Sequence, residues 1–295
     1  MIWFDCADPF TGSFSASQAN LEITGTEPAQ LLLARLLTGT CKFKYSHETN
    51  YIYSRINFTQ LPYNSRSRSF NRIFTAFLPS GYSLDDYSSY IGQNRIRNKE
   101  FYEEICQEIA NCLYWYEKKR FANSFIFLYR FLETISFAFP QIYALREREF
   151  NKTYDHLKGF FNNDKTATEL KFFKMFCTKI LTSSYSTSTI KVDTTFASSH
   201  AEQDKIWDEL HRLANSSNTF RGGNKPTHLE IDLVNFGSFI IEVRNRYFHF
   251  LRGTWQENVS SKNIANLENM FQSIISPSLN WIGILYMELT SAIIT

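Results

Sequence analysis

One short segment combines an arginine, an asparagine and a histidine at a spacing that could bring all three together. On a helix, Asn245 and His249 are four residues apart and share a face, which the long side chain of Arg244 can also reach. Imidazole exchanges a proton near neutral pH, and guanidinium binds anions through a planar set of donors. Apolar neighbours such as Val243 and Tyr247 would hold the segment at the edge of a core. The segment therefore predicts a site for proton exchange and anion binding.

The bare spacing of an arginine and a later histidine is weak evidence, because it also occurs by chance. Arg221 and His228 satisfy the same loose pattern, but two glycines and a proline lie between them. Those residues would prevent the helix that brings the two side chains together. Residues 244–249 alone combine the spacing with an asparagine and an uninterrupted amphipathic pattern.

Arg244 and Asn245, followed by His249 in a late helix of a helical unit, resemble the signature of HEPN domains. The aromatic-rich segment 127–133 is similar to the helix that packs beside the motif helix in many of these domains. The resemblance covers about residues 100–295. It implies a mainly α fold, a HEPN-like helical bundle, although a Ser/Thr-rich insertion departs from a compact bundle.

The resemblance implies a metal-independent endoribonuclease, in which the RNA 2′-hydroxyl attacks the adjacent phosphate and leaves a cyclic phosphate. His249 would exchange the proton, and Arg244 would hold the negative charge of the pentacoordinate phosphate. Asn245 would orient the phosphate or the imidazole. Similar domains form homodimers in which two motif helices face each other, so the implied site is a composite groove at a two-fold interface.

Three further side chains could support such a site. If its helix lies alongside, Glu133 could fix the Arg244 guanidinium in a bidentate pair, and Arg246 or Arg130 could bind flanking phosphates. The alternative for Glu133 is an ordinary ion pair with Arg130 or a solvated position. The alternative for His249 is a hydrogen-bonded residue at the core boundary.

Three functions remain open at this stage. The first is a toxin or antiviral defence effector that cleaves RNA once triggered, under the control of a regulatory protein or antitoxin. The second is a non-catalytic HEPN-like module that binds RNA, a nucleotide or a protein and uses the motif helix only for dimer packing. The third is a helical scaffold with an accidental motif, in which Arg244 and His249 point apart.

The net charge is too small to attract a polyanion to the whole molecule, because the chain has 31 Lys and Arg and 29 Asp and Glu. Any RNA site must therefore be local. Arginines interleaved with Phe and Tyr could form a second surface for a phosphate backbone and unpaired bases, or merely a solvated basic face. These arginines are Arg55, Arg66, Arg68, Arg72, Arg95 and Arg97.

The five cysteines are scattered and include no pair at metal-ligand spacing, so we expect reduced thiols, no metal and no cofactor. The first residues lack a basic region followed by an apolar run, which argues against a secretory signal. The most apolar stretch, Leu279 to Ile294, contains Asn280 and Glu288 and predicts a buried packing helix rather than a membrane span. Together these features predict a cytoplasmic protein.

Residues 1–97 predict a small α+β domain, a possible sensor or regulator, ahead of the helical domain at 98–295. Its expected helix spans 27–37, and its strand-like segments are 42–45, 51–59 and 73–78.

The helical domain begins with amphipathic patterns at 101–116, 125–139 and 170–180. We expect the first two helices to pack antiparallel beside the motif helix. A Ser/Thr-rich insertion near 182–226 would hold a loop at 182–199, a helix at 202–213 and a turn at 222–226. Beyond it, Thr227 and Glu230 have the form of a capping box for a helix running toward Leu251. Ser260 or Ser261 can cap a further helix that runs through 267–274, and Pro277 begins the last one.

Overall fold

The computed structural model describes most of the chain, and helices dominate it. The described residues are 4–10, 14–63, 73, 75, 78, 80–136, 138, 141, 144, 149, 151–155, 158, 169–248, 258–260, 264 and 266–294. Helix accounts for 59% and strand for 10%, so the expectation of a mainly α protein is confirmed.

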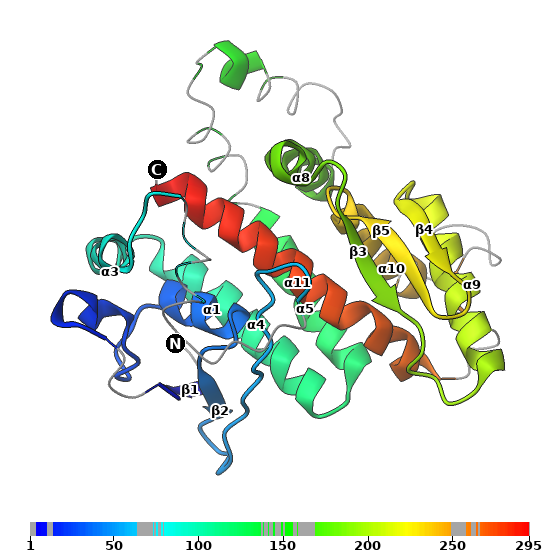
Figure 1. The fold of residues 1–295 in the computed structure, drawn as a ribbon, viewed down its shortest axis with the longest axis horizontal. Helices are drawn as coiled ribbons and strands as arrows, with labels where there is room; N and C mark the ends of the chain where they lie inside the picture. Colours follow the sequence, from blue (N-terminus) through cyan, green and yellow to red (C-terminus); the bar gives the residue numbers. More distant parts are fainter. Residues whose placement is uncertain are drawn as a thin grey trace.

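Helices α4 (Lys99–Glu117) and α5 (Phe121–Ser136) form an antiparallel hairpin, as their periodic apolar positions predict. The connection is short and passes through Lys119, which adopts a left-handed conformation (φ 60°). Ser124 Oγ donates to the Cys112 carbonyl at 2.7 Å and ties the two helices together near this turn. Helix α5 packs against the C-terminal helix α11 (Leu267–Ile294), which crosses the molecule (Figure 1).

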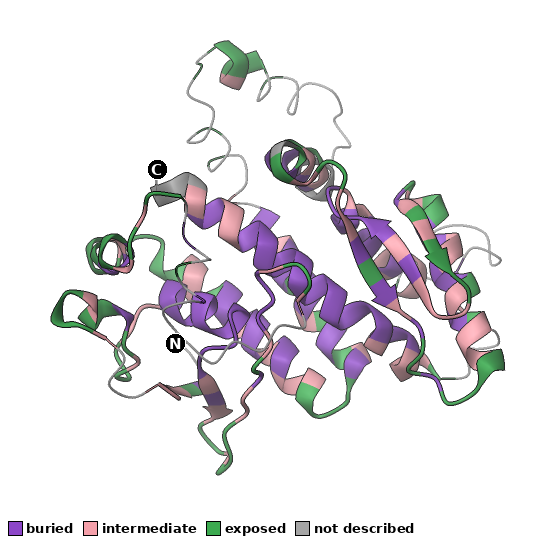
Figure 2. Cartoon of the chain, in the orientation of Figure 1, coloured by how far each residue is buried: buried purple, intermediate pink, exposed green. Residues whose placement is uncertain are grey.

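Helix α11 is continuous through Pro277, so the prediction of two helices with a break at that proline is wrong. A proline inside a helix removes one hydrogen bond and costs about 3 kcal/mol. Residues 273–286 are nevertheless all buried, and packing on every side of the helix outweighs that cost (Figure 2). Of the stretch 279–294 that was predicted to pack inside the protein, residues 279–286, 289 and 290 are buried. Among the described residues, no helix has both the length and the apolar character needed to cross a membrane.

The N-terminal part contains a two-stranded antiparallel sheet, β1 (Phe4–Ala7) with β2 (Lys42–Tyr45), and the helices η1 (Ala16–Leu21), α1 (Ala29–Leu37) and α3 (Leu84–Gln93). The predicted helix at 27–37 and strand at 42–45 are confirmed.

The predicted strand at 51–59 is wrong, because only Ile52 forms a bridge, with Phe43. At the end of this segment and just beyond it, two carbonyls bond to a side chain instead of a neighbouring strand. The Phe58 and Gln60 carbonyls accept hydrogen bonds from Asn280 of α11, at 2.8 Å and 2.9 Å. Of the predicted strand at 73–78, only residues 73, 75 and 78 are described, and the first two are helical.

The N-terminal part and the long helices share one hydrophobic core. Helix α1 is buried along its whole length against α4 and α11, as Figure 2 shows. Tyr286 of α11 donates to the Gln30 carbonyl at 3.0 Å, and Gly283 lies so close to Phe58 that an added Cβ would meet its carbonyl oxygen at 2.4 Å. A boundary near residue 97 therefore does not separate two cores.

Asn280→Ala tests this shared core. The substitution leaves two carbonyls of the 58–60 segment without their donor in a buried position, so we expect a loss of about 2 kcal/mol in the free energy of unfolding. Urea titration followed by circular dichroism would measure it. Asn215→Ala, at an exposed position on the helix His200–Ser216, is the matched control and should change stability by less than about 0.5 kcal/mol. Equal stability of the two variants would contradict a shared core.

The region beyond α8 (Glu169–Tyr185) forms a three-stranded antiparallel sheet that the sequence patterns did not predict. Its order is β3–β5–β4, from β3 (Thr189–Asp193), β4 (Phe220–Asn224) and β5 (His228–Asp232). Helix α9 (His200–Ser216) confirms the predicted helix at 202–213, and the Ser199 side chain caps it by accepting from the Glu202 amide.

Three predictions about this region are wrong. The expected loop at 182–199 contains the end of α8 and strand β3, in which Ile190 and Val192 are buried and alternate with more exposed neighbours. The expected turn at 222–226 is largely strand, and the capping box at Thr227 is absent because 228–232 is strand β5. The helix that carries the motif, α10, therefore begins later, at Phe236, and ends at Phe248.

Candidate active site

Helix α10 is fixed at its N-terminal end by a tryptophan of α11. Trp281 is fully buried, and its Nε1 donates to the Leu233 carbonyl at 2.9 Å, just before the helix begins. Gly237 lies against the same indole ring, where an added Cβ would meet a ring carbon at 2.8 Å. The N-terminal end of the helix is therefore packed in the core, and its last turns carry the polar residues of the motif.

Arg244 contacts side chains from two helices. Its Nη1 donates to Asn245 Oδ1 at 3.1 Å, and its Nη2 lies 3.5 Å from Glu133 Oε1 of α5. Its Cζ is 4.6 Å from the centroid of the Tyr129 ring, also on α5. The Arg244 side chain is 21% exposed. A planar cation held against an aromatic face, a carboxylate and an amide has a restricted orientation while part of it still faces the surface.

In the described part of the chain, Glu133 and Arg130 form no ion pair with each other. Glu133 approaches Arg244 through one oxygen, so the contact is not the bidentate pair that was expected, and its side chain is 45% exposed. Arg130 pairs with Glu108 of α4, whose Oε1 lies 2.8 Å from Arg130 Nη2. Burial raises the pKa of Glu108, against the lowering effect of that guanidinium.

Arg246 is engaged on another part of the helix surface. Its Nε donates to Glu242 Oε1 at 2.8 Å, and Ser216 of α9 donates to the same oxygen at 2.7 Å. Burial acts to raise the pKa of Glu242, but these two hydrogen bonds outweigh it and hold the pKa below its usual value. Arg246 therefore faces α9, whereas Arg244 faces α5, and the structure does not bring the two arginines together.

His249 lies outside the described residues. The motif can therefore be followed in the structure only through Arg244 and Asn245. Phe248, the last residue of α10, stacks with Phe125 of α5 at a centroid distance of 6.3 Å and an interplanar angle of 5°. The end of the motif helix is thus held against the helix that supplies Tyr129 and Glu133. Helix α4, expected beside the motif helix as well, packs instead mainly on α1 and α5.

Tyr129 is a polar residue of this site that the sequence patterns did not single out. The residue is 5% exposed, and its hydroxyl makes no hydrogen bond. Burial raises its pKa most, the Arg244 charge opposes that rise, and the Glu133 carboxylate adds to it through its charge and through its interaction with the phenol hydroxyl. Tyr129 and Glu133 stand four residues apart on α5, and this spacing is the signal in the sequence that places them on one face of the helix.

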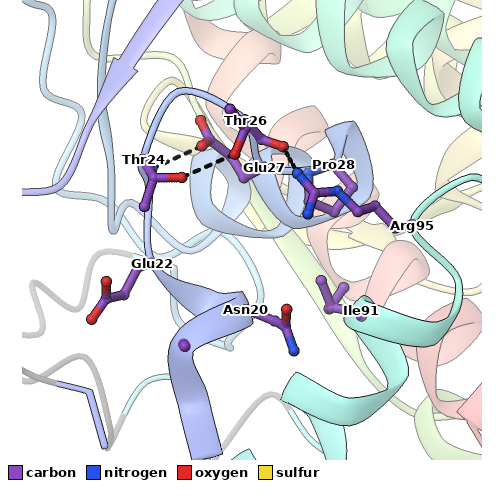
Figure 3. Close-up of a pocket in the computed structure, with 10 residues that line it drawn as sticks. Asn20, Glu22, Thr24, Thr26, Glu27, Pro28, Ile91 and Arg95 are labelled. Carbon is purple, nitrogen blue, oxygen red and sulfur yellow. Dashed lines mark hydrogen bonds between the residues drawn. The ribbon is translucent and has the colours of Figure 1, made fainter. Parts of the chain in front are cut away.

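The second basic surface is only partly described, since Arg66, Arg68 and Arg72 lie outside the described residues. Arg55 lies over the Tyr53 ring at 4.9 Å. Arg95 donates to the Thr26 carbonyl and lines a polar pocket of about 60 Å³ (Figure 3). Glu27 in this pocket accepts from the amides of residues 24 and 25, so its carboxylate serves the local turn. This pocket lies at the α3 end of the molecule, far from α10 (Figure 1).

Two searches complete the description of the site. Within the described part of the chain, no group of three or more His, Cys, Asp or Glu side chains is placed to hold a metal ion. Comparison of the chain with protein-family models, curated proteins and solved structures gives no match.

Proposed function

We propose that the chain is a metal-independent endoribonuclease with Arg244, Asn245 and His249 as its catalytic residues. One observation carries the proposal: the Arg244 guanidinium is oriented by Tyr129 and Glu133 of α5 and by its neighbour on α10, yet remains partly exposed. A cation fixed before the substrate arrives stabilises developing negative charge without reorganising during the reaction.

The reaction forms a bond between the 2′-oxygen and phosphorus and breaks the bond to the 5′-oxygen. Neutral His249 would remove the proton of the attacking 2′-hydroxyl, and the imidazolium formed in this way, directly or through a water molecule, would give that proton to the leaving 5′-oxygen. Arg244 would donate to the nonbridging oxygens, whose negative charge grows as the phosphorus becomes pentacoordinate. Asn245 holds Arg244 through its carbonyl oxygen, which leaves its amide nitrogen to orient the phosphate or the imidazole.

Two other basic residues differ in how well they could serve RNA binding. The side chain of Arg130 is 57% exposed and projects from α5, the helix that holds Arg244, so it can reach a flanking phosphate. Both arginines form an ion pair at 2.8 Å, Arg130 with Glu108 and Arg246 with Glu242, but the Arg246 side chain is only 20% exposed, which weakens its case as a phosphate ligand. The proposal therefore favours Arg130 over Arg246.

The biological setting proposed with this activity follows from the HEPN resemblance. The chain would act as a cytoplasmic homodimer, with two motif helices facing each other across a two-fold axis. It would serve as a toxin or antiviral defence effector, with residues 1–97 in a sensing or regulatory role and a regulatory protein or antitoxin as partner. Light scattering at micromolar concentration should give the mass of a dimer, and a monomer would contradict this arrangement.

Incubation of the purified chain with end-labelled RNA tests the proposed chemistry. We expect cleavage that continues in excess EDTA and gives fragments ending in a 2′,3′-cyclic phosphate. RNA with 2′-deoxyribose at the cleaved positions should stay intact, because the attacking group is missing. Dependence on added Mg²⁺, or cleavage of the deoxy substrate, would contradict the mechanism. Binding without cleavage would favour a non-catalytic RNA-binding module.

A further inference from the structure

The hydroxyl of Tyr129 is buried and interacts with the Glu133 carboxylate without forming a hydrogen bond of ordinary length and angle. The residue is 5% exposed, and the hydroxyl oxygen is buried without a hydrogen-bond partner. Two other tyrosines use their hydroxyls: the buried Tyr286 donates to the Gln30 carbonyl at 3.0 Å, and the half-buried Tyr116 bonds with Ser276 at 2.9 Å. Burying a polar group without a hydrogen bond costs free energy. A buried hydroxyl without a partner therefore points to a role other than stabilising the fold.

The surroundings of Tyr129 are those of a charged site. Arg244 covers its ring at 4.6 Å, and Glu133, one helical turn further along α5, contacts the same guanidinium. Burial first, and then the Glu133 charge, raise the pKa of Tyr129 and outweigh Arg244. The phenol therefore stays protonated at neutral pH and can act as a hydrogen-bond donor.

We propose that Tyr129 donates its hydroxyl hydrogen to a nonbridging oxygen of the RNA phosphate that Arg244 holds. The inference rests on the proposed function and adds a residue to its substrate-binding site. A phenol and a guanidinium beside one another offer donors to the same anionic group, and hydrogen bonds to a charged acceptor are the stronger kind. The described structure already shows one anionic group, the Glu133 carboxylate, against this guanidinium.

Access to the hydroxyl depends on Glu133. Its carboxylate meets Arg244 through a single oxygen at 3.5 Å, and its side chain is 45% exposed. Exposed ion pairs of this kind contribute little to stability, so the Glu133 side chain can rotate away from Arg244 at low cost. A phosphate entering at the same edge of the guanidinium then replaces the carboxylate and meets the phenol.

Tyr129→Phe is the decisive variant, because it removes the hydroxyl and keeps the ring beneath Arg244. We expect kcat for RNA cleavage to fall about 100-fold, the loss typical for one donor to a developing oxyanion. The melting temperature should change little, because the hydroxyl forms no hydrogen bond of ordinary geometry in the free protein. A merely structural tyrosine would give the opposite pattern, a lower melting temperature with unchanged kcat.

Tyr286→Phe is the matched control. It removes a hydroxyl that is bonded within the core between α11 and the residue 30 carbonyl, so the melting temperature should fall while kcat stays at the parental value. Binding of fluorescein-labelled 2′-O-methyl RNA, which cannot be cleaved, supplies a readout that does not depend on catalysis. Tyr129→Phe should weaken that binding, and Tyr286→Phe should not.

The outcomes separate this inference from the proposed function. If the parental protein cleaves RNA and Tyr129→Phe cleaves it equally fast, the inference is overturned and the ribonuclease proposal stands. If the parental protein binds the 2′-O-methyl RNA but cleaves no RNA, the ribonuclease proposal fails, and weaker binding by Tyr129→Phe still supports the inference. Equal binding by both proteins overturns it, as does a lower melting temperature for Tyr129→Phe.

Discussion

Arg244→Ala is expected to lower the rate of RNA cleavage by about 10²–10⁴-fold while the protein stays folded. The substitution removes the cation that would stabilise the pentacoordinate phosphate, and single groups in such roles contribute factors of this size. The structural cost is small because the side chain is partly exposed and its ion pair with Glu133 is half open to solvent. Loss of packing over Tyr129 should reduce stability by about 1 kcal/mol.

Arg244→Lys separates charge from geometry. Lysine keeps the positive charge but lacks the planar fork that Asn245 and Glu133 now orient. We therefore expect it to recover only a small part of the lost rate. Recovery to the parental rate would mean that simple charge suffices and that the orientation seen in the structure is unimportant.

His249→Ala should lower the cleavage rate by a factor comparable to that for Arg244→Ala, because the proposed acid–base group is lost. Arg212→Ala is the matched control for both variants, since Arg212 lies on α9, pairs with Glu209 and has no proposed role in the site. Cleavage and thermal unfolding should be measured on the same preparations. If Arg244→Ala or His249→Ala cleaves at the parental rate, or loses activity only through unfolding, the catalytic assignment is wrong.

The long helices could be predicted because their apolar residues repeat at helical spacing. Phe101 to Tyr116 and Phe125 onward each place one apolar face toward a partner, and the structure contains α4 and α5 at those positions. The same reasoning failed at Pro277. The local preference of proline predicts a helix end, whereas α11 is enclosed by its neighbours and continues.

The three-stranded sheet was missed because its strands are short and their composition is unusual. Strand β4 contains two adjacent glycines, which normally indicate a turn. Gly223 is required there because its φ is +145° and an added Cβ would meet the His228 carbonyl oxygen at 2.5 Å. At the start of β5, the residues Thr227 to Glu230 resemble a capping box, but Leu229 and Ile231 alternate with less buried neighbours, as in a strand with one buried face.

The candidate site could be predicted only in part, because contacts between helices are not visible in the sequence. A sequence can show that Arg244 and Asn245 are neighbours on a helix, but the approach of α5 depends on tertiary packing. That packing places Glu133 near Arg244 and pairs Arg130 with Glu108 instead. It also turns Tyr129, a member of an apparently apolar stripe, into a polar group beneath the guanidinium.

Trp281→Ala is expected to cause the largest loss of stability, about 3–5 kcal/mol in the free energy of unfolding. The indole is fully buried, packs edge-on against Phe173 of α8 at 5.9 Å and tilts against Phe236 of α10 at 6.3 Å. Its removal leaves a large cavity and also deprives the buried Leu233 carbonyl of its donor. Since single domains are stable by about 5–15 kcal/mol in total, this variant should be close to unfolding at 37 °C.

Because Trp281 holds α8 and α10 against α11, its loss should also reduce RNA cleavage, but by a route different from that of Arg244→Ala. At 15 °C, where the folded fraction recovers, activity per folded molecule should return toward the parental value, whereas Arg244→Ala should stay inactive. Trp207→Ala is the matched control, since that indole is only half-buried on α9 and should cost about 1 kcal/mol. Urea titration gives the stabilities and single-turnover cleavage gives the activities. A stability loss for Trp281→Ala no larger than the control value would show that this tryptophan does not anchor the motif helix.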